Sequence, residues 1–212
     1  MRFLDREDAG KQLAEKLLEY KDTKPVVLAL PRGGVPIGVE VAKALDAPLD
    51  LLIIRKIGHP MHPEYAIGAV GEEGEPLLHP IETQYVDQVW LQNEIKRQRQ
   101  EIKRRKESYL PSINHVPWKD RTVILVDDGA ATGFTMLAAL KQLKSMNVKK
   151  IIGALPVVSP DTLRQLERLA DDMVAVEVPR VFLGGVGAYY HDFRQVPDEE
   201  VIAMLKRIYD QD

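Results

Sequence analysis

Cysteine is absent from the 212 residues of this chain. The absence excludes disulfide bonds, thiolate metal sites and cysteine nucleophiles, and it is typical of a reducing compartment, so we expect a cytoplasmic location. No apolar run approaches the roughly 18 residues that a membrane helix needs. The first residues mix acids with bases, whereas a signal peptide would be cationic and then apolar. We therefore expect neither export nor a membrane partner.

A marked excess of either charge is also missing. Lys and Arg number 29 and Asp and Glu number 32, which gives a formal net charge of -3. A protein this close to neutrality has no overall attraction for nucleic acid or for an anionic membrane, so any anion site must be local. The length and the composition, 45% hydrophobic and 29% charged, predict a single globular domain over residues 1–212.

Short apolar runs alternate with segments of helical periodicity. The runs, expected to be buried strands, are residues 26–30, 50–54, 122–126, 150–158 and 173–178. Apolar positions at three- and four-residue steps predict helices over 8–20, 35–45, 134–146, 160–170 and 197–209. Strands that alternate with helices of this length predict an α/β fold with a doubly wound, mainly parallel sheet.

Residues 55–121 interrupt this alternation. Residues 58–74 are rich in Gly, Pro and His, which predicts a mobile loop, with 66–70 as a strand of a small sheet or hairpin. Residues 83–110 keep a helical stripe without Pro or Gly, which predicts one long helix that ends at Pro111.

The segment 123–135, VILVDDGAATGFT, carries the clearest chemical signal. A buried strand ends in Asp127 and Asp128 and continues through a loop of small residues into a helix. The loop and helix start hold Gly129, Ala130, Ala131, Thr132, Gly133, Phe134 and Thr135. Small residues let backbone N–H groups approach a ligand, and a helix start favours negative charge, so this segment predicts a phosphate site. Two adjacent carboxylates suit sugar hydroxyls or a metal instead, which together indicates a sugar phosphate. The alternative is a solvated strand end with Gly133 as a helix boundary.

This segment resembles the fingerprint of the type I phosphoribosyltransferase family, in which two acidic residues and a short loop ending in Thr-Gly-x-Thr follow a strand. The matching residues are Asp127, Asp128, Ala131, Thr132, Gly133 and Thr135. The resemblance implies that the acidic pair binds the ribose hydroxyls of phosphoribosyl diphosphate (PRPP) and that the loop binds its 5′-phosphate. It also implies a Mg²⁺-dependent transfer of ribose 5-phosphate from PRPP to a nitrogenous base, with release of diphosphate.

A second loop, residues 30–34, joins the first expected strand to the following helix. Arg32, Gly33 and Gly34 place a cation and small residues beside a helix N-terminus, which suits a second anion. The resemblance implies that this is the diphosphate loop. It also implies that Arg55 and Lys56, at the expected end of the second strand, face the diphosphate. The alternatives are a tight turn with a surface arginine and a solvated strand end.

The resemblance further implies a small hood and flexible loop, formed by the insertion 58–120 and the C-terminal segment 181–196. The 58–74 loop would close over substrate, with Glu64 as a candidate catalytic residue. Phe182 and Leu183 match the place where 6-oxopurine members stack an aromatic ring on the base, although core packing explains Phe182 equally well. Those members carry a carboxylate where Ala131 stands, so the acceptor base stays open.

Two further features have competing interpretations. His59 and His62 could be metal ligands, but without a clear third ligand they are better interpreted as surface residues. The helix over 83–110 holds Lys96, Arg97, Arg99, Lys103, Arg104, Arg105 and Lys106 against Glu94, Glu101 and Glu107. A regulator that binds nucleic acid is one interpretation, but a solvent-facing helix over the hood or at a homodimer contact is favoured, because helical charge runs usually face solvent. The alternative function is a non-catalytic sensor of PRPP or a nucleotide with the same fold.

Overall fold

The computed structural model describes residues 2–113 and 115–209, except for the side chains of Glu64 and Leu110. Its central element is a sheet of five parallel strands in the order β2-β1-β6-β7-β8. The strands are β1 (Val26–Ala29), β2 (Leu49–Leu51), β6 (Thr122–Val126), β7 (Lys150–Val157) and β8 (Asp172–Glu177). β1 and β6 are buried at every position, which explains why they are apolar runs without alternation.

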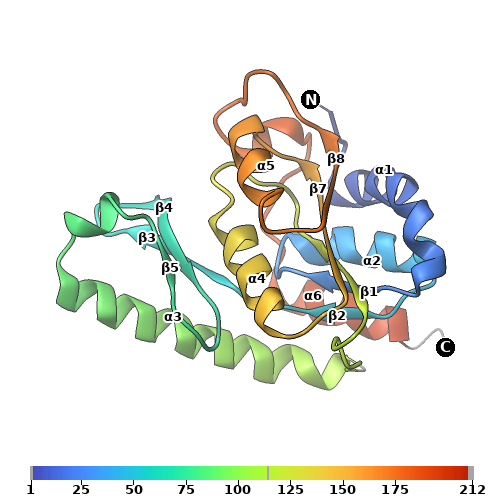
Figure 1. Ribbon diagram of the computed structural model, residues 1–212, viewed down its shortest axis with the longest axis horizontal. Coiled ribbons are helices and arrows are strands. Elements are labelled where there is room, and N and C mark those ends of the chain that lie inside the picture. Colours follow the sequence, from blue (N-terminus) through green and yellow to red (C-terminus); the bar gives the residue numbers. More distant parts are fainter. Residues whose placement is uncertain (1, 114, 210–212) are drawn as a thin grey trace.

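Helices cover both faces of this sheet (Figure 1). On one face lie α1 (Arg6–Leu17), α2 (Gly34–Leu45) and α6 (Asp198–Tyr209), whose buried residues share one core cluster. On the other face, α4 (Phe134–Ser145) and α5 (Pro160–Leu166) pack in a second cluster. The predicted doubly wound α/β architecture is therefore confirmed. No helix within the described residues is both long enough and apolar enough to span a bilayer.

The sheet reverses its strand order at β1, which pairs with β2 on one side and with β6 on the other. In open α/β sheets, ligands bind in the crevice outside the carboxyl ends of the strands at such a reversal. The loop after β1 and the loop after β6 both begin at this edge. The topology thus brings together two segments that are far apart in the sequence.

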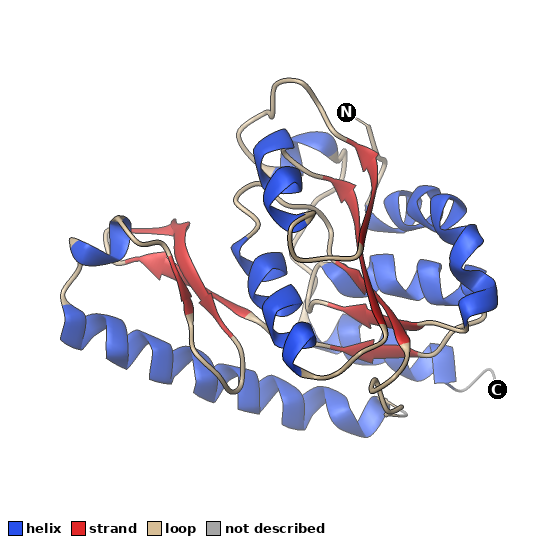
Figure 2. Cartoon of the chain, in the orientation of Figure 1, coloured by secondary structure: helices blue, strands red, loops and turns tan. Residues whose placement is uncertain are grey.

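A second, antiparallel sheet lies to one side of the central sheet (Figure 2). Its strands are β3 (Arg55–His59), β4 (His62–Val70) and β5 (Leu77–Leu78), and α3 (Gln88–Tyr109) runs along it toward α6. Four short 3-10 helices complete the described elements, η1 (Leu18–Thr23), η2 (Glu82–Gln84), η3 (Leu110–Ser112) and η4 (Val186–Tyr189).

The strand predicted over 66–70 is confirmed as part of β4, but the prediction of a mobile loop over 58–74 is wrong, because most of this segment is the β3–β4 hairpin. Ile57 and Ile67 are fully buried and anchor the pairing. Gly68 lets β5 approach, since an added Cβ would lie 2.6 Å from the carbonyl oxygen of Leu77. The second predicted strand is also shorter than expected, so Arg55 and Lys56 begin the small sheet rather than end β2.

A buried carboxylate fixes the connection between α3 and β6 to the edge of the central sheet. Asp50 in β2 is fully buried. Its Oδ2 accepts a hydrogen bond from Nε1 of Trp118 at 2.9 Å and lies 3.0 Å from Nδ1 of His115. Its Oδ1 accepts the backbone N–H of Leu51 at 2.7 Å. These contacts bind the segment before β6 to β2.

Asp50→Ala should therefore destabilise the protein. The substitution leaves the indole N–H and the Leu51 amide without their acceptor and creates a cavity, so we expect the free energy of unfolding to fall by about 3 kcal/mol. Urea unfolding measures this change. Asp22→Ala, at an exposed position, is the matched control and should change it by less than about 0.5 kcal/mol. Equal stability of the two variants would contradict the anchoring role of Asp50.

Candidate functional site

A cavity of about 640 Å³ lies at the carboxyl edge of β1 and β6. Both loops at the strand-order reversal line it, together with parts of the small sheet and of the chain before α6. The lining residues that the sequence singled out are Arg32, Gly33, Arg55, Lys56, Asp127, Asp128, Gly129, Ala130, Ala131, Thr132, Gly133, Phe134 and Thr135. The structure therefore brings most of the predicted site residues into one space.

The loop after β6 presents the start of a helix to this cavity. Gly129 and Gly133 have φ values of +152° and +70°, backbone conformations that favour glycine. Gly133 is the N-cap of α4 and no side chain caps this helix. The first-turn N–H groups of α4 are thus available to an anion, as the sequence predicts.

Two residues that the sequence analysis missed hold this loop. The carbonyl oxygen of Ala131 accepts hydrogen bonds from Oγ of Ser159 at 2.9 Å and from Oγ1 of Thr162 at 2.5 Å. Ser159 also caps α5 by accepting the N–H of Thr162. The only sequence signal was the Ser-Pro start of a helix, which indicates a cap and not a contact with a loop from another strand.

The two aspartates are half-buried, and their charges are differently compensated. Oδ2 of Asp128 accepts a hydrogen bond from Nε of Arg6 at 2.8 Å. Oδ1 of Asp127 accepts the backbone N–H of Asp128 at 2.9 Å. Burial raises the pKa of both carboxyls; the charge of Asp128 raises the pKa of Asp127 further, while Arg6 opposes both shifts. Both carboxyls therefore favour the neutral form more than an exposed aspartate does.

Arg6 is a further residue that sequence reasoning missed. It is the first residue of α1, which begins there because the side chain of Asp5 accepts the N–H of Asp8. Its guanidinium lies 3.9 Å from the ring centroid of Phe193 and donates to the carbonyl oxygen of Arg194 at 2.8 Å. Nothing in the helical pattern of α1 signals a contact 122 residues away.

The loop after β1 packs directly against the acidic pair. A Cβ added at Gly33 would collide with Oδ2 of Asp128, and one added at Gly34 would lie 2.8 Å from the carbonyl oxygen of Val126. Both glycines are thus required for the close approach of the two loops. The peptide bond between Pro31 and Arg32 is cis. Of these two glycines, Gly33 lines the cavity, whereas the contact of Gly34 is with the strand end.

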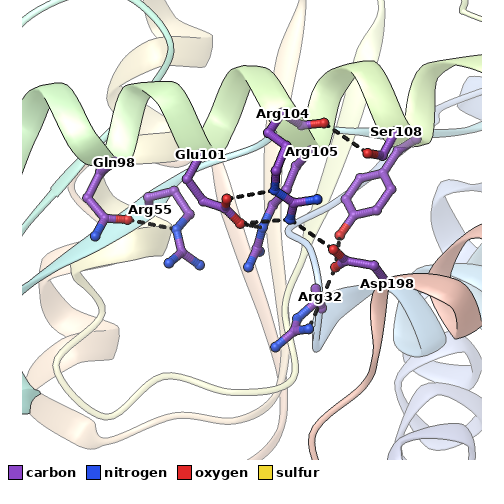
Figure 3. Close-up of polar contacts among 9 residues, drawn as sticks. Arg32, Arg55, Gln98, Glu101, Arg104, Arg105, Ser108 and Asp198 are labelled. Atoms are coloured by element: carbon purple, nitrogen blue, oxygen red, sulfur yellow. Dashed lines mark hydrogen bonds and ion pairs between the residues drawn. The ribbon is translucent and has the colours of Figure 1, made fainter.

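Part of the cavity wall is cationic. Arg32, Arg55 and Arg105 all line it, the last from helix α3 (Figure 3). The sequence analysis grouped Arg105 with a solvent-facing charge run, but this residue is only 6% exposed. Arg105 is buried because of how α3 packs, and the sequence around Arg105 does not indicate this burial.

Besides Gly34, three predicted positions lie elsewhere or cannot be described. Among the described residues, Gly184, Gly185 and Val186 line the cavity, whereas Phe182 and Leu183 do not. The ring of Phe182 packs on Tyr189 with centroids 5.2 Å apart, and Leu183 is largely exposed. The side chain of Glu64 lies outside the described part of the structure.

The acidic pair is the part of the cavity lining whose donors suit a metal ion. No cluster of three or more His, Asp or Glu side chains that could hold a metal occurs among them. His59 and His62 stack with centroids 5.8 Å apart, and Nδ1 of His59 accepts the N–H of Met61. Mg²⁺ needs only one or two carboxylates when substrate phosphates and water complete its shell, so Asp127 and Asp128 are suitable donors.

Residues 3–191 match the family model of the phosphoribosyl transferase domain. The chain is 39% identical over 209 residues to a Mycobacterium tuberculosis protein with the name "Putative phosphoribosyl transferase". The match covers 98% of this chain and 47% of that protein, so the chain spans about half the length of this curated relative.

A similar solved structure is that of the TT1426 protein from Thermus thermophilus. It is 45% identical, with a TM-score of 0.79 over 98% of this chain and 99% of that chain. The AQ2163 protein from Aquifex aeolicus shares the fold at 11% identity, with a TM-score of 0.50 over 82% of this chain and 74% of that one. With the family model matched over nearly the whole sequence and the fingerprint at the cavity, this chain belongs to the type I phosphoribosyltransferase family.

Proposed function

We propose that this protein transfers ribose 5-phosphate from PRPP to a nitrogenous base and releases diphosphate. The observation that carries the proposal is the arrangement of charges in the cavity. An uncapped helix start, a pair of carboxylates and a group of guanidiniums surround one space. Each of these groups suits one part of PRPP, namely the 5′-phosphate, the ribose hydroxyls and the diphosphate.

The binding roles follow from the groups that face the cavity. Backbone N–H groups at residues 131–135 bind the 5′-phosphate, with the hydroxyls of Thr132 and Thr135 as further donors. Asp127 and Asp128 accept hydrogen bonds from the ribose hydroxyls. Arg32, Arg55 and Lys56 bind the diphosphate. The base would lie near Tyr65, Ala66 and the 184–186 backbone, which line the remaining part of the cavity.

The chemistry needs positioning and charge stabilisation rather than a nucleophilic side chain. The bond from ribose C1 to the diphosphate oxygen breaks as the bond to the base nitrogen forms, and the proton that this nitrogen loses passes to solvent. Positive charge develops on the ribose and negative charge on the leaving diphosphate. The carboxylates stabilise the first and the guanidiniums the second, in a site that excludes part of the solvent. Bound Mg²⁺ would supply further positive charge at the diphosphate, held by Asp127 or Asp128.

Several finer statements stay predictions of this proposal. They are Mg²⁺ dependence, small-molecule substrates without a nucleic-acid or membrane partner, a cytoplasmic location, a homodimer, and a hood formed by residues 58–120 and 181–196 within one domain. This chain spans about half the length of the curated relative. The activity, substrates and partners of the whole protein are therefore also proposals.

Asp127→Asn combined with Asp128→Asn should lower PRPP-dependent turnover by at least about a hundredfold while the protein stays folded. The amides keep the shape of the carboxylates but lose the charge that faces the ribose. A diphosphate-release assay with PRPP, Mg²⁺ and a panel of free bases measures turnover, and circular dichroism checks folding. Glu19→Gln combined with Asp22→Asn, at exposed positions, removes the same charge and should leave turnover unchanged.

The same assay separates the enzyme from a PRPP sensor. PRPP binding by calorimetry without diphosphate release for any base would favour the sensor. Unchanged turnover in the doubly substituted protein would remove the acidic pair from the mechanism. Failure of the unaltered protein to bind PRPP would overturn both functions.

The affinity for Mg²⁺ and PRPP together should rise with pH on the alkaline side of the ordinary aspartate pKa of 3.8. Burial raises the pKa of Asp127 and Asp128, and only the charged carboxylates bind well. Without ligand, the free energy of unfolding changes with pH in the opposite direction to this affinity. The folded state holds these protons more tightly than the unfolded state, so the free energy of unfolding falls as pH rises through the raised pKa.

Calorimetry and urea unfolding across a pH series measure the two trends. The single variant Asp127→Asn is the control, because the ligand still titrates in it as before whereas the carboxyl of residue 127 is gone. We expect both the affinity and the free energy of unfolding of this variant to depend less on pH. Identical profiles for the variant and the unaltered protein would contradict the assignment of the titrating group.

A further inference from the structure

Helix α3 sends one of its basic side chains into the cavity. Seven Lys and Arg residues lie between positions 96 and 106, and of these Arg105 lines the cavity. The other positions have different surroundings, since Arg97 pairs with Glu94, Arg99 donates to the carbonyl oxygen of Gly74 and Lys106 pairs with Glu72. Arg105 is thus the member of the run that is placed to meet a ligand.

The buried face of α3 is polar where it passes the cavity. Gln98 and Arg105 are buried and Glu101 is partly buried, at the three- and four-residue spacing that puts them on one side of a helix. Oε1 of Gln98 accepts a hydrogen bond from Nε of Arg55 at 2.9 Å. Oε1 of Glu101 accepts one from Nε of Arg105 at 2.8 Å. Both arginines are therefore oriented through Nε, which leaves their terminal nitrogens for another partner (Figure 3).

The charge in this region is not balanced by the protein. Arg55 forms no ion pair with a carboxylate of the described residues, and its hydrogen-bond partner Gln98 is neutral. Its pKa is lowered by burial and by the positive charges of Arg105 and Arg32. Three guanidiniums that line one cavity create a region of positive potential, and such a region attracts a multivalent anion.

Two carboxylates that do not line the cavity position these cations. Glu101 pairs with Arg104 as well as with Arg105, and these contacts lower its pKa to about 2 despite the opposing effect of burial. Asp198, the first residue of α6, accepts hydrogen bonds from Arg104 at 2.9 Å and from the Tyr109 hydroxyl at 2.6 Å.

The same Asp198 lies 3.6 Å from Nη1 of Arg32 (Figure 3). Two carboxylates, those of Glu101 and Asp198, thus hold Arg32, Arg104 and Arg105, and Arg55 lies beside this group (Figure 3). The two negative charges fix the geometry of the cations without neutralising them.

We propose that Arg105 completes the subsite for the diphosphate of PRPP together with Arg32 and Arg55, and that Glu101 and Asp198 are positioning residues for it. This proposal rests on the proposed function and assigns a role to helix α3. A planar guanidinium binds phosphate oxygens through paired hydrogen bonds, and three of them from the loop after β1, from β3 and from α3 surround one space. The basic helix is then part of the active site and not a solvated cover.

The test compares ligands that carry the diphosphate with one that lacks it. Arg105→Gln should weaken binding of PRPP and of free diphosphate, measured by calorimetry with Mg²⁺, by about tenfold or more. Binding of ribose 5-phosphate should change by less than about twofold, because this ligand does not reach Arg105. Lys103→Gln is the matched control: it removes one positive charge from an exposed position of the same helix and should leave all three affinities unchanged.

The outcomes separate this inference from the function on which it rests. If the unaltered protein binds no PRPP, the proposed function fails. If it binds PRPP but Arg105→Gln binds PRPP, diphosphate and ribose 5-phosphate as tightly as the unaltered protein, the role of Arg105 is overturned. An equal loss for ribose 5-phosphate and PRPP also overturns it, since that pattern indicates a general structural effect.

A second variant covers the case in which Arg105→Gln does not fold. Arg105→Lys keeps the charge next to Glu101 and loses the paired donors. We expect it to weaken PRPP and diphosphate binding by a smaller factor, about threefold, with ribose 5-phosphate unaffected. The proposal would be overturned if the ratio of the affinities for PRPP and ribose 5-phosphate were the same in this variant as in the unaltered protein.

Discussion

The site depends on the parallel direction of β1 and β6. Because both strands end at the same edge of the sheet and the strand order reverses between them, their loops must meet over one crevice. Gly33 and Gly34 let the two loops pack against each other at the acidic pair. A sheet with these two strands antiparallel would separate the carboxylates from the loop after β1 by the length of a strand.

The second constraint is the distribution of charge around the crevice. Two half-buried aspartates whose ionisation is costly form one group in its lining, and three arginines with incomplete ion pairing form the other. Each group of like charges is by itself unfavourable in a partly buried cavity, because a charge removed from water needs compensation. The proposed ligand, which carries hydroxyls, phosphates and a divalent cation, would compensate both groups at once. Its binding would therefore relieve an electrostatic cost that the fold alone leaves in place.

The local part of this arrangement could be predicted from the sequence. The acidic pair, the glycine loop and the helix start are contiguous, so residues 123–135 carry the whole signal. The flanking strands were also predictable, because burial on both faces makes them uniformly apolar. The β3–β4 hairpin was not, since its Gly, Pro and His residues hide the pairing that Ile57 and Ile67 support.

The long-range part could not be predicted in the same way. Arg6 and Arg105 lie on helices whose patterns give no sign of a cavity, and only tertiary packing brings them to Asp128 and Arg55. Phe182 illustrates the reverse case, because an aromatic residue in the expected segment packs on Tyr189 and its glycine neighbours line the cavity instead.

The contact of Asp198 with Arg32 has a consequence for the order in which the protein matures on the ribosome. Arg32 and Tyr109 emerge long before α6, and until residue 198 has been synthesised the carboxylate that orients them is missing. The nascent chain can form the sheet and the acidic crevice while this cationic wall is still unsupported. Affinity for an anion at this wall would then be acquired only after α6 has docked, later than the strands and the acidic pair have formed.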